Sequence, residues 1–150
     1  MDYILDTNIL VTYLRNNNKF STQIDEKYSP LSGKNTSIIS VVSVGEIKSI
    51  ATRNKWGSKR LAKLDILLNE FITADINVES IVNRYAEIDA FSQGKLESKK
   101  SNFTARNMGK NDLWIAATAS IFNIKLLTTD KDFSHLDKEF VDVEQIELVK

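Results

Sequence analysis

The chain has 150 residues, enough for one domain with a sizeable core, and its hydrophobic content of 42% is ordinary for a globular protein. Its 20 basic and 20 acidic residues cancel, so the net charge does not by itself indicate a nucleic-acid partner. It has no cysteine, which excludes disulfides, cysteine-ligated zinc and thiol chemistry and suits the cytoplasm, where we expect the protein to act. No apolar stretch predicts a membrane span, and the first residues lack a secretory signal pattern. We expect a single domain over residues 1–150.

The pattern of apolar residues predicts strands that alternate with helices. A buried strand at residues 3–5 ends at Asp6, and a helix follows at once. We then expect, in order, a helix over 20–28, a strand over 36–42, and helices over 43–54 and from 58 onward. The second half predicts a strand over 72–78, a helix over 80–94, a basic connection over 96–110, a helix over 111–122 capped by Asn111, a strand over 125–129 and an edge strand within 140–148. This alternation predicts an α/β fold, with a central, mainly parallel sheet of four to five strands between two helical layers.

Four acidic residues fall at comparable places in these elements. Asp6 and Asp130 each follow a strand, whereas Glu46 and Asp112 lie in the first turn of a helix. Each position has a local explanation. Asp6 could cap the following helix, Ser43 and Glu46 fit a capping box, Asp112 complements a helix dipole and Asp130 could form an Asx turn.

Taken together, the four acids also have a functional explanation. If the first, second and fourth strands are parallel neighbours, all four carboxylates lie at one edge of the sheet. Carboxylates a few ångströms apart repel each other, and a hard cation such as Mg²⁺ removes that cost. Such an ion could activate water for phosphodiester hydrolysis. The single histidine, His135, lies in a polar stretch, and we expect it to be exposed rather than a ligand.

Four short motifs contain these acids: Ile4–Asn8 (ILDTN), Ser43–Ile47 (SVGEI), Asn111–Ala117 (NDLWIAA) and Leu127–Phe133 (LTTDKDF). In this order, and spanning nearly the whole chain, they resemble the motifs of the PIN-domain family of metal-dependent ribonucleases. The resemblance is closest to the VapC-type toxins of bacterial toxin–antitoxin pairs. It implies a three-layer α/β/α PIN-like fold.

The resemblance also implies a mechanism and a set of site residues. The protein would be an endoribonuclease that hydrolyses RNA by metal-activated water and leaves a 3′-hydroxyl. The metal, Mg²⁺ or Mn²⁺, would be held by the four acids that also carry catalysis: Asp6, Glu46, Asp112 and Asp130. Asp132 is a less favoured substitute for Asp130. Supporting contacts would come from Thr7, Asn8 and Thr128.

RNA binding would use basic residues outside the motifs. Candidates for phosphate contacts are Arg106, Lys110 and four members of the basic run at 53–63, namely Arg53, Lys55, Lys59 and Arg60. Trp56 could stack on a base or pack against the core. The resemblance further implies an RNA substrate such as tRNA or mRNA, a small VapB-type antitoxin and a homodimer. Apolar helix faces around Ile47 and Leu64 could serve these contacts or simply fill the core.

Other functions stay open at this point. VapC toxins often carry more basic residues around the site than this neutral chain, so a PIN nuclease for RNA processing, or an orphan PIN protein without an antitoxin, is an alternative. A phosphatase of the haloacid-dehalogenase type also begins with a strand-end aspartate. Such enzymes have an Asp-x-Asp pattern, however, whereas this chain has Asp6-Thr7-Asn8. An inactive binding module on the PIN scaffold is a further alternative.

Overall fold

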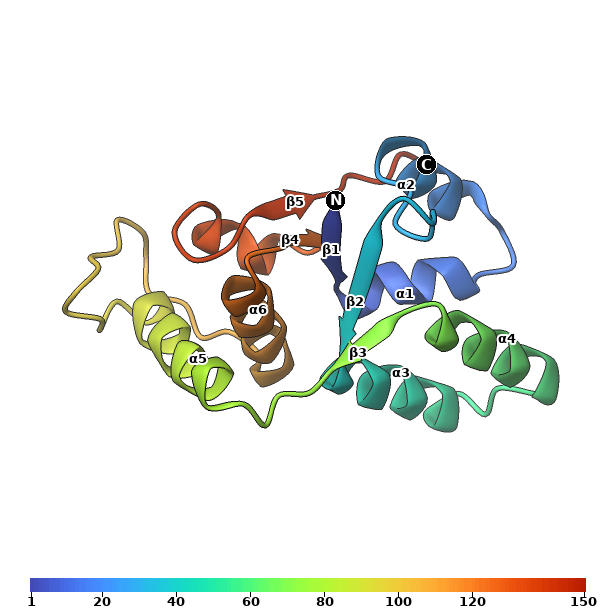
Figure 1. Cartoon of the computed structure of the whole chain (residues 1–150), viewed down its shortest axis with the longest axis horizontal. Helices are drawn as coiled ribbons and strands as arrows, with labels where there is room; N and C mark the ends of the chain where they lie inside the picture. Colours follow the sequence, from blue (N-terminus) through green and yellow to red (C-terminus); the bar gives the residue numbers. More distant parts are fainter.

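Five parallel strands form the centre of the molecule, in the order β3-β2-β1-β4-β5 (Figure 1). The computed structural model describes residues 1–150. The strands are β1 (Asp2–Leu5), β2 (Thr36–Ser40), β3 (Ile72–Ala74), β4 (Lys125–Thr128) and β5 (Val143–Gln145). The prediction of a mainly parallel sheet is therefore confirmed, and β1 lies between β2 and β4 as the convergence of the acids requires.

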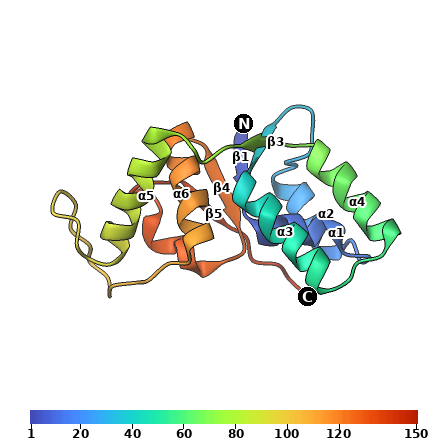
Figure 2. The same cartoon turned by 90° about the horizontal axis from the view of Figure 1, so that it is seen from below.

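Helices cover both faces of this sheet, as seen almost edge-on in Figure 2. One face carries α5 (Glu79–Ser92) and α6 (Lys110–Phe122). The other carries α1 (Thr7–Leu14), α2 (Lys19–Lys27), α3 (Val41–Arg53) and α4 (Ser58–Asn69). A short 3₁₀ helix, η1 (Lys131–Leu136), follows β4. The three-layer α/β/α architecture is thus confirmed, and none of the helices combines the length and apolar character needed to cross a membrane.

Adjacent residues of the central strands point to opposite faces of the sheet. Ile4 belongs to the apolar cluster beneath α5 and α6, whereas Leu5 belongs to the cluster beneath the other four helices. In β4, Leu126 and Leu127 divide in the same way. Because both faces are buried, the central residues of β1 and β4 are apolar, and the chain becomes polar again where these strands end. The ends of β1 and β4 are therefore the natural place for a polar site.

The start of α3 differs from the prediction. The strand β2 ends at Ser40 rather than at residue 42, and the Ser40 hydroxyl accepts a hydrogen bond from the backbone N–H of Val42 at 3.2 Å as the helix cap. Val41 and Val42 favour a strand by composition, but this cap and packing of the helix override that preference. The predicted capping box was wrong, because Ser43 lies inside the helix and Glu46 lies beyond its first turn.

Three other predicted boundaries also moved. The helix α6 begins at Lys110 with Gly109 at the N-cap position, so Asn111 is not the cap, although Asp112 does lie in the first turn. The strands β3 and β5 have only three residues each. Residues 93–109 form an irregular connection between α5 and α6, in agreement with the predicted basic segment.

Candidate active site

The acids of the four motifs lie around the C-terminal ends of the central strands. Asp6 directly follows β1, and Asp130 lies two residues beyond β4. Glu46 comes from α3, which follows β2, and Asp112 comes from the first turn of α6. Parallel pairing brings the C-terminal ends of β2, β1 and β4 to one edge of the sheet.

Asp6 is buried and held by two hydrogen bonds. Its side chain is 3% exposed. One carboxylate oxygen accepts from the backbone N–H of Thr7 at 2.8 Å, and the other accepts from the hydroxyl of Thr128 at 2.8 Å. Burial raises the pKa of Asp6 to about 6, the two hydrogen bonds oppose this shift, and the charges of Asp130 and Glu46 add to it. Asp6 therefore caps α1 and is also an electrostatic member of the cluster.

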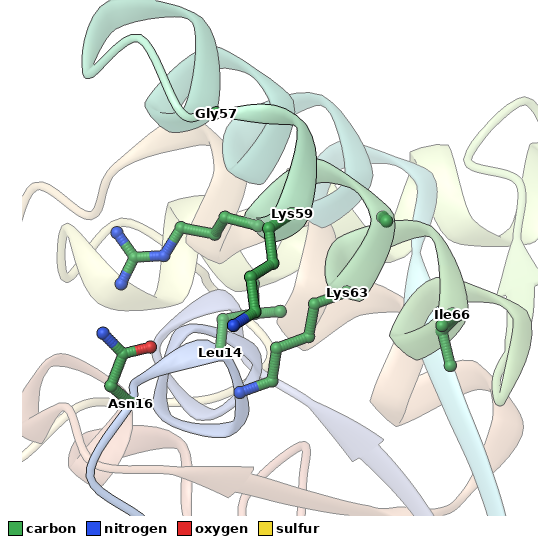
Figure 3. A pocket seen from close by; sticks show the side chains of 8 residues that line it. Leu14, Asn16, Gly57, Lys59, Lys63 and Ile66 are labelled. Carbon is green, nitrogen blue, oxygen red and sulfur yellow. The ribbon is translucent and has the colours of Figure 1, made fainter.

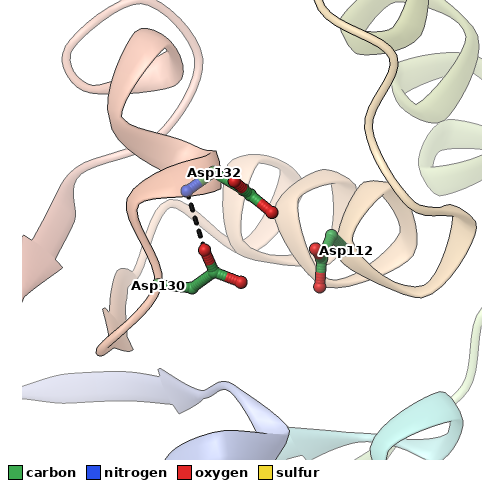
Figure 4. Close-up of side chains that lie close together, drawn as sticks. All are labelled: Asp112, Asp130 and Asp132. Carbon is green, nitrogen blue, oxygen red and sulfur yellow. Dashed lines mark hydrogen bonds between the residues drawn. The ribbon is translucent and has the colours of Figure 1, made fainter.

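Three further aspartates face one another beside it (Figure 4). Asp112, Asp130 and Asp132 each offer a carboxylate oxygen, and these oxygens all lie within 4.8 Å of one another. Asp130 also caps η1, because its Oδ1 accepts from the backbone N–H of Asp132 at 2.9 Å. Burial raises the pKa of Asp112 to about 7, with further contributions from the charges of Asp6, Asp130, Glu46 and Asp132. Asp132, the less favoured candidate, thus belongs to the same cluster as Asp130.

Glu46 is oriented by hydroxyl groups. The hydroxyl of Thr7 donates to Glu46 Oε1 at 2.7 Å and lies 3.0 Å from the hydroxyl of Ser43, which is fully buried. Thr128 likewise links Asp6 to Asp130, whose backbone N–H donates to its hydroxyl at 2.9 Å. Two of the three predicted supporting residues therefore contact the acids. The side chain of Asn8 is exposed and makes no hydrogen bond, and the role of Ser43 was missed because the capping box gave it another partner.

A family model for the PIN domain matches residues 3–139. The chain belongs to the PIN-domain family. The resemblance drawn from the four motifs is confirmed, and the haloacid-dehalogenase alternative has no such support. A comparison with curated proteins finds no match.

The fold of this PIN domain is also that of chains in solved toxin–antitoxin complexes. It is similar to a chain of VapBC2 from Rickettsia felis bound to a promoter DNA fragment, with 24% identity, a TM-score of 0.74, and coverage of 98% of this chain and 100% of that chain. A chain of VapBC-1 from nontypeable Haemophilus influenzae gives 25% identity, a TM-score of 0.71 and coverage of 97% and 98%. A chain of VapBC-5 from Mycobacterium tuberculosis gives 21% identity and a TM-score of 0.61, with coverage of 97% of this chain and 98% of that chain.

The acids of the PIN domain fit a hard divalent cation. Lys and Arg side chains form ion pairs elsewhere in the structure, but none pairs with the five carboxylates of the cluster, which are those of Asp6, Glu46, Asp112, Asp130 and Asp132. The carboxylate of Asp112 also makes no hydrogen bond within the protein, although the residue is partly buried. An all-oxygen set of mutually repelling ligands suits Mg²⁺ or Mn²⁺ better than softer metals.

The predicted RNA-binding residues lie at different distances from the acids. Lys110 lines a hollow of about 410 Å³ together with Glu46 and Asp112, and Arg53 lines a neighbouring hollow of about 350 Å³ with Glu46. Arg106 lines a hollow that also includes Asp132. These three cations therefore border the acidic cluster.

The rest of the basic run lies away from those hollows. Lys59 and Arg60, with Lys63, line a separate hollow of about 670 Å³, where lysines of α4 extend toward the end of α1 (Figure 3). Lys55 is exposed in the turn before α4 and lines none of these hollows. Trp56 packs against the core, and the guanidinium of Arg60 lies 4.7 Å from its ring centroid. The packing interpretation of Trp56 is thus favoured over base stacking.

His135 was expected to be exposed, and that prediction was wrong. Its ring is partly buried, and Nε2 lies 2.7 Å from the hydroxyl of Ser92. Burial, together with the charge of Arg106, lowers the pKa of His135 to about 4. The partners of His135 are 43 and 29 residues away along the chain, so no local sequence signal could have found them.

Proposed function

We propose that this PIN protein is a VapC-type toxin, a Mg²⁺- or Mn²⁺-dependent endoribonuclease that hydrolyses RNA phosphodiester bonds. The observation that carries the proposal is the group of five electrostatically coupled carboxylates, Asp6, Glu46, Asp112, Asp130 and Asp132, in the motifs of a PIN domain. The fold shared with chains of VapBC complexes supports the toxin assignment.

The metal would be held by Asp6, Glu46, Asp112 and Asp130, with Asp132 at its border. When bound, the ion lowers the pKa of the attacking water and neutralises charge on the phosphate and leaving oxygens. The protein contributes the fixed positions of the ligands. Thr128 holds one oxygen of Asp6, and Thr7 holds one oxygen of Glu46, so neither carboxylate has to reorganise when substrate arrives.

Basic residues around the acids would bind the RNA backbone. Lys110 and Arg53 lie on the Glu46 side of the cluster, and Arg106 lies on the Asp132 side. Cations on both sides of an acidic centre would allow a polyanion to cross it. Lys55, Lys59 and Arg60 would contribute less, since they do not line the hollows beside the acids.

The direct test is cleavage of single-stranded RNA and of tRNA by the wild-type protein and by Asp6→Asn. We expect cleavage with Mg²⁺ or Mn²⁺, none with EDTA, and a loss of at least about 100-fold in the variant, because a ligand is removed. Lys34→Ala is a matched control, since Lys34 is exposed at the opposite edge of the sheet, before β2. Equal activity of Asp6→Asn, or activity that survives chelation, would contradict the proposal.

The proposed partner is a small VapB-type antitoxin. The hollow of Figure 3 is bordered by the exposed apolar side chain of Ile66, and its cations have no acidic neighbour in the lining. This combination suits an amphipathic segment with acidic residues at its edge. By contrast, Ile47 and Leu64 are buried in the core and are not available to a partner. Replacing Lys59 and Lys63 by Glu should weaken binding of the antitoxin at least 10-fold in a pull-down titration, and unchanged binding would place the antitoxin elsewhere.

A second candidate function is that of a PIN nuclease that processes RNA without an antitoxin. The observation that favours it is the zero net charge of the chain, since VapC toxins often carry more basic residues around the site. Both functions use the same acids and predict the same metal dependence. They differ in cells, because only a toxin should arrest growth when expressed alone and be relieved by coexpression of the neighbouring small open reading frame. Growth that is unaffected by an active enzyme would favour RNA processing. A homodimer, which the toxin assignment also implies, is tested by sedimentation.

A further inference from the structure

A groove leads away from the acidic cluster between the 93–109 connection and η1. Its inner part, about 600 Å³ in volume, is lined by Arg106, Asn107, Met108, Lys131, Asp132 and Ser134. Its outer part, about 420 Å³, shares Arg106 and Ser134 and continues past Lys100 and Phe103. We call the two parts together the Arg106 groove. It begins at one of the five acids, so a substrate bound at the acids can extend into it.

Arg106 is held in this groove by a directed chain of hydrogen bonds. Its backbone N–H donates to the carbonyl of Ser92 at 2.7 Å, and its guanidinium Nη1 donates to His135 Nδ1 at 3.4 Å. Because a guanidinium can only donate, Nδ1 is the acceptor in this contact when the ring proton resides on Nε2, and the ring also lies within hydrogen-bond reach of the backbone of Asp132. Nε2 then donates to the Ser92 hydroxyl at 2.7 Å, which donates to Met108 Sδ at 3.3 Å.

The remaining donors of Arg106 are free to bind a ligand. Neither Arg106 nor Lys131 forms an ion pair with a carboxylate, although three such pairs exist elsewhere. The guanidinium also lies 6.0 Å from the ring centroid of Phe103. A planar, oriented guanidinium with unused N–H groups matches the geometry of a phosphate, and a neighbouring ammonium adds charge.

We propose that Arg106 and Lys131 form a subsite for the RNA phosphate next to the one that is cleaved, and that His135 and Ser92 position Arg106 for this contact. The inference rests on the proposed nuclease function. It adds a defined place for the substrate: the strand leaves the acids past Asp132 and follows the Arg106 groove toward Lys100. An acidic protein segment in the same groove is the competing occupant, and the experiments below distinguish it from RNA.

The first experiment measures RNA binding without cleavage. Binding of a fluorescent single-stranded RNA in EDTA is followed by anisotropy over a range of salt concentrations. Each phosphate contact contributes about 0.7 to the slope of log affinity against log salt for single strands. Arg106→Ala and Lys131→Ala should each reduce the slope by about that amount, whereas Lys34→Ala should not. Unchanged slopes in both variants would overturn the subsite and favour a protein occupant.

The second experiment locates the phosphate. A neutral methylphosphonate is placed at single linkages on either side of the scissile bond. At one adjacent linkage it should slow cleavage by the wild type about 10-fold or more, the size expected for a lost charged hydrogen bond. Arg106→Ala should show the same loss with normal RNA and no further loss with the modified one. Additive losses would contradict the contact. If the wild type cleaves no RNA at all, the nuclease proposal fails, and the salt slopes still test the subsite.

The positioning role of His135 has its own signature. His135→Leu removes the acceptor for Arg106, so we expect KM to rise several-fold with kcat preserved, and no further rise in the Arg106→Ala background. His135→Gln, whose amide oxygen can accept the same hydrogen bond, should recover part of the loss. A purely structural role would instead lower kcat or stability and would persist in the double variant, and that result would overturn the assignment.

Discussion

At the scale of single residues, burial decides how the acidic cluster behaves. Asp6 has two hydrogen bonds that favour its charged form, yet its pKa is raised to about 6 because the side chain is nearly inaccessible to water. Asp112 has no such hydrogen bonds, and burial raises its pKa to about 7. Without a cation, the folded protein therefore retains protons on these groups near neutral pH, and an ion that binds there replaces them.

This proton uptake predicts how the metal-free protein responds to pH. The pKa values of Asp6 and Asp112 are both raised from 3.8, so between about pH 4 and pH 7 these two groups bind more protons in the folded state than in the unfolded state. The lowered pKa of His135 has the opposite effect between about pH 4 and pH 6.5, but it involves one group against two, so the folded state still binds more protons in total. The free energy of unfolding must then fall as pH rises through this range and level off above it. Urea melts in EDTA from pH 4 to pH 9 measure this dependence.

Asp112→Asn is the variant that isolates the effect. An uncharged side chain removes repulsion, so in EDTA at pH 8 the variant should be more stable than the wild type, and its pH dependence should be shallower. With excess Mg²⁺ the order should reverse, because the variant has lost a ligand. A variant less stable than the wild type in EDTA would show that the Asp112 carboxylate is not strained by its neighbours.

The hydroxyl of Thr7 supports a different prediction. It is the donor to Glu46, so Thr7→Val should leave that carboxylate without its hydrogen bond and weaken Mn²⁺ binding by roughly 10-fold, a typical loss for an outer partner of a ligand. Thr7→Ser retains the hydroxyl and should bind within about 2-fold of the wild type. Mn²⁺ titration of the three proteins checks the order. Weaker binding in Thr7→Ser, which loses the methyl group, but not in Thr7→Val, which keeps it, would assign the effect to packing of the Thr7 methyl group instead.

At the scale of elements, sequence patterns located the strands and helices but misplaced two helix starts that border the site. Val41 and Val42 continue the β-branched run of β2, and only the buried hydroxyl of Ser40 reveals that the helix has already begun. Similarly, Asn111 is the better cap by residue type, but Gly109 occupies that position. Asp6 and Asp130 could be predicted because they follow strands whose order a parallel sheet constrains, and Glu46 and Asp112 because their motifs lie near helix starts.

Asp132 and Arg106 were candidates from the sequence, but their contacts could not be predicted in this way. Asp132 joins the cluster because η1 begins immediately after Asp130 and turns the next carboxylate back toward Asp112. The series of hydrogen bonds from Arg106 through His135 to Ser92 joins segments that are far apart in the sequence. Such contacts depend on tertiary packing, which periodicity and local motifs do not encode.

The cap of α3 gives a test at this scale. Ser40→Ala removes the acceptor for the Val42 N–H and should cost about 1 kcal/mol of stability, lowering Tm by about 2–4 °C. Ser43→Ala, at the position that sequence alone suggested, should leave the helix start intact and instead affect metal binding through Thr7. Thermal melting of the two variants distinguishes them. A larger loss in Ser43→Ala would restore the original placement of the cap.

At the scale of the whole molecule, a neutral chain separates its charges around one edge of the sheet. Five carboxylates gather where β1 and β4 end, and cations border them on both sides without forming ion pairs with them. The parallel order β2-β1-β4 produces this gathering from segments spread over most of the sequence. The zero net charge therefore conceals an arrangement suited to a metal ion and a polyanion.

Calorimetric titration of the wild-type protein with Mn²⁺, in buffers of different ionisation enthalpy, tests this arrangement most directly. If the carboxylates form one cation site, Mn²⁺ should bind and release about one to two protons near pH 6. At pH 9 it should release almost none, because Asp6 and Asp112, whose pKa values are raised, are already ionised there. Asp112→Asn should bind at least about 10-fold more weakly. Absence of binding, or binding equal in strength and proton release in the variant, would contradict the account.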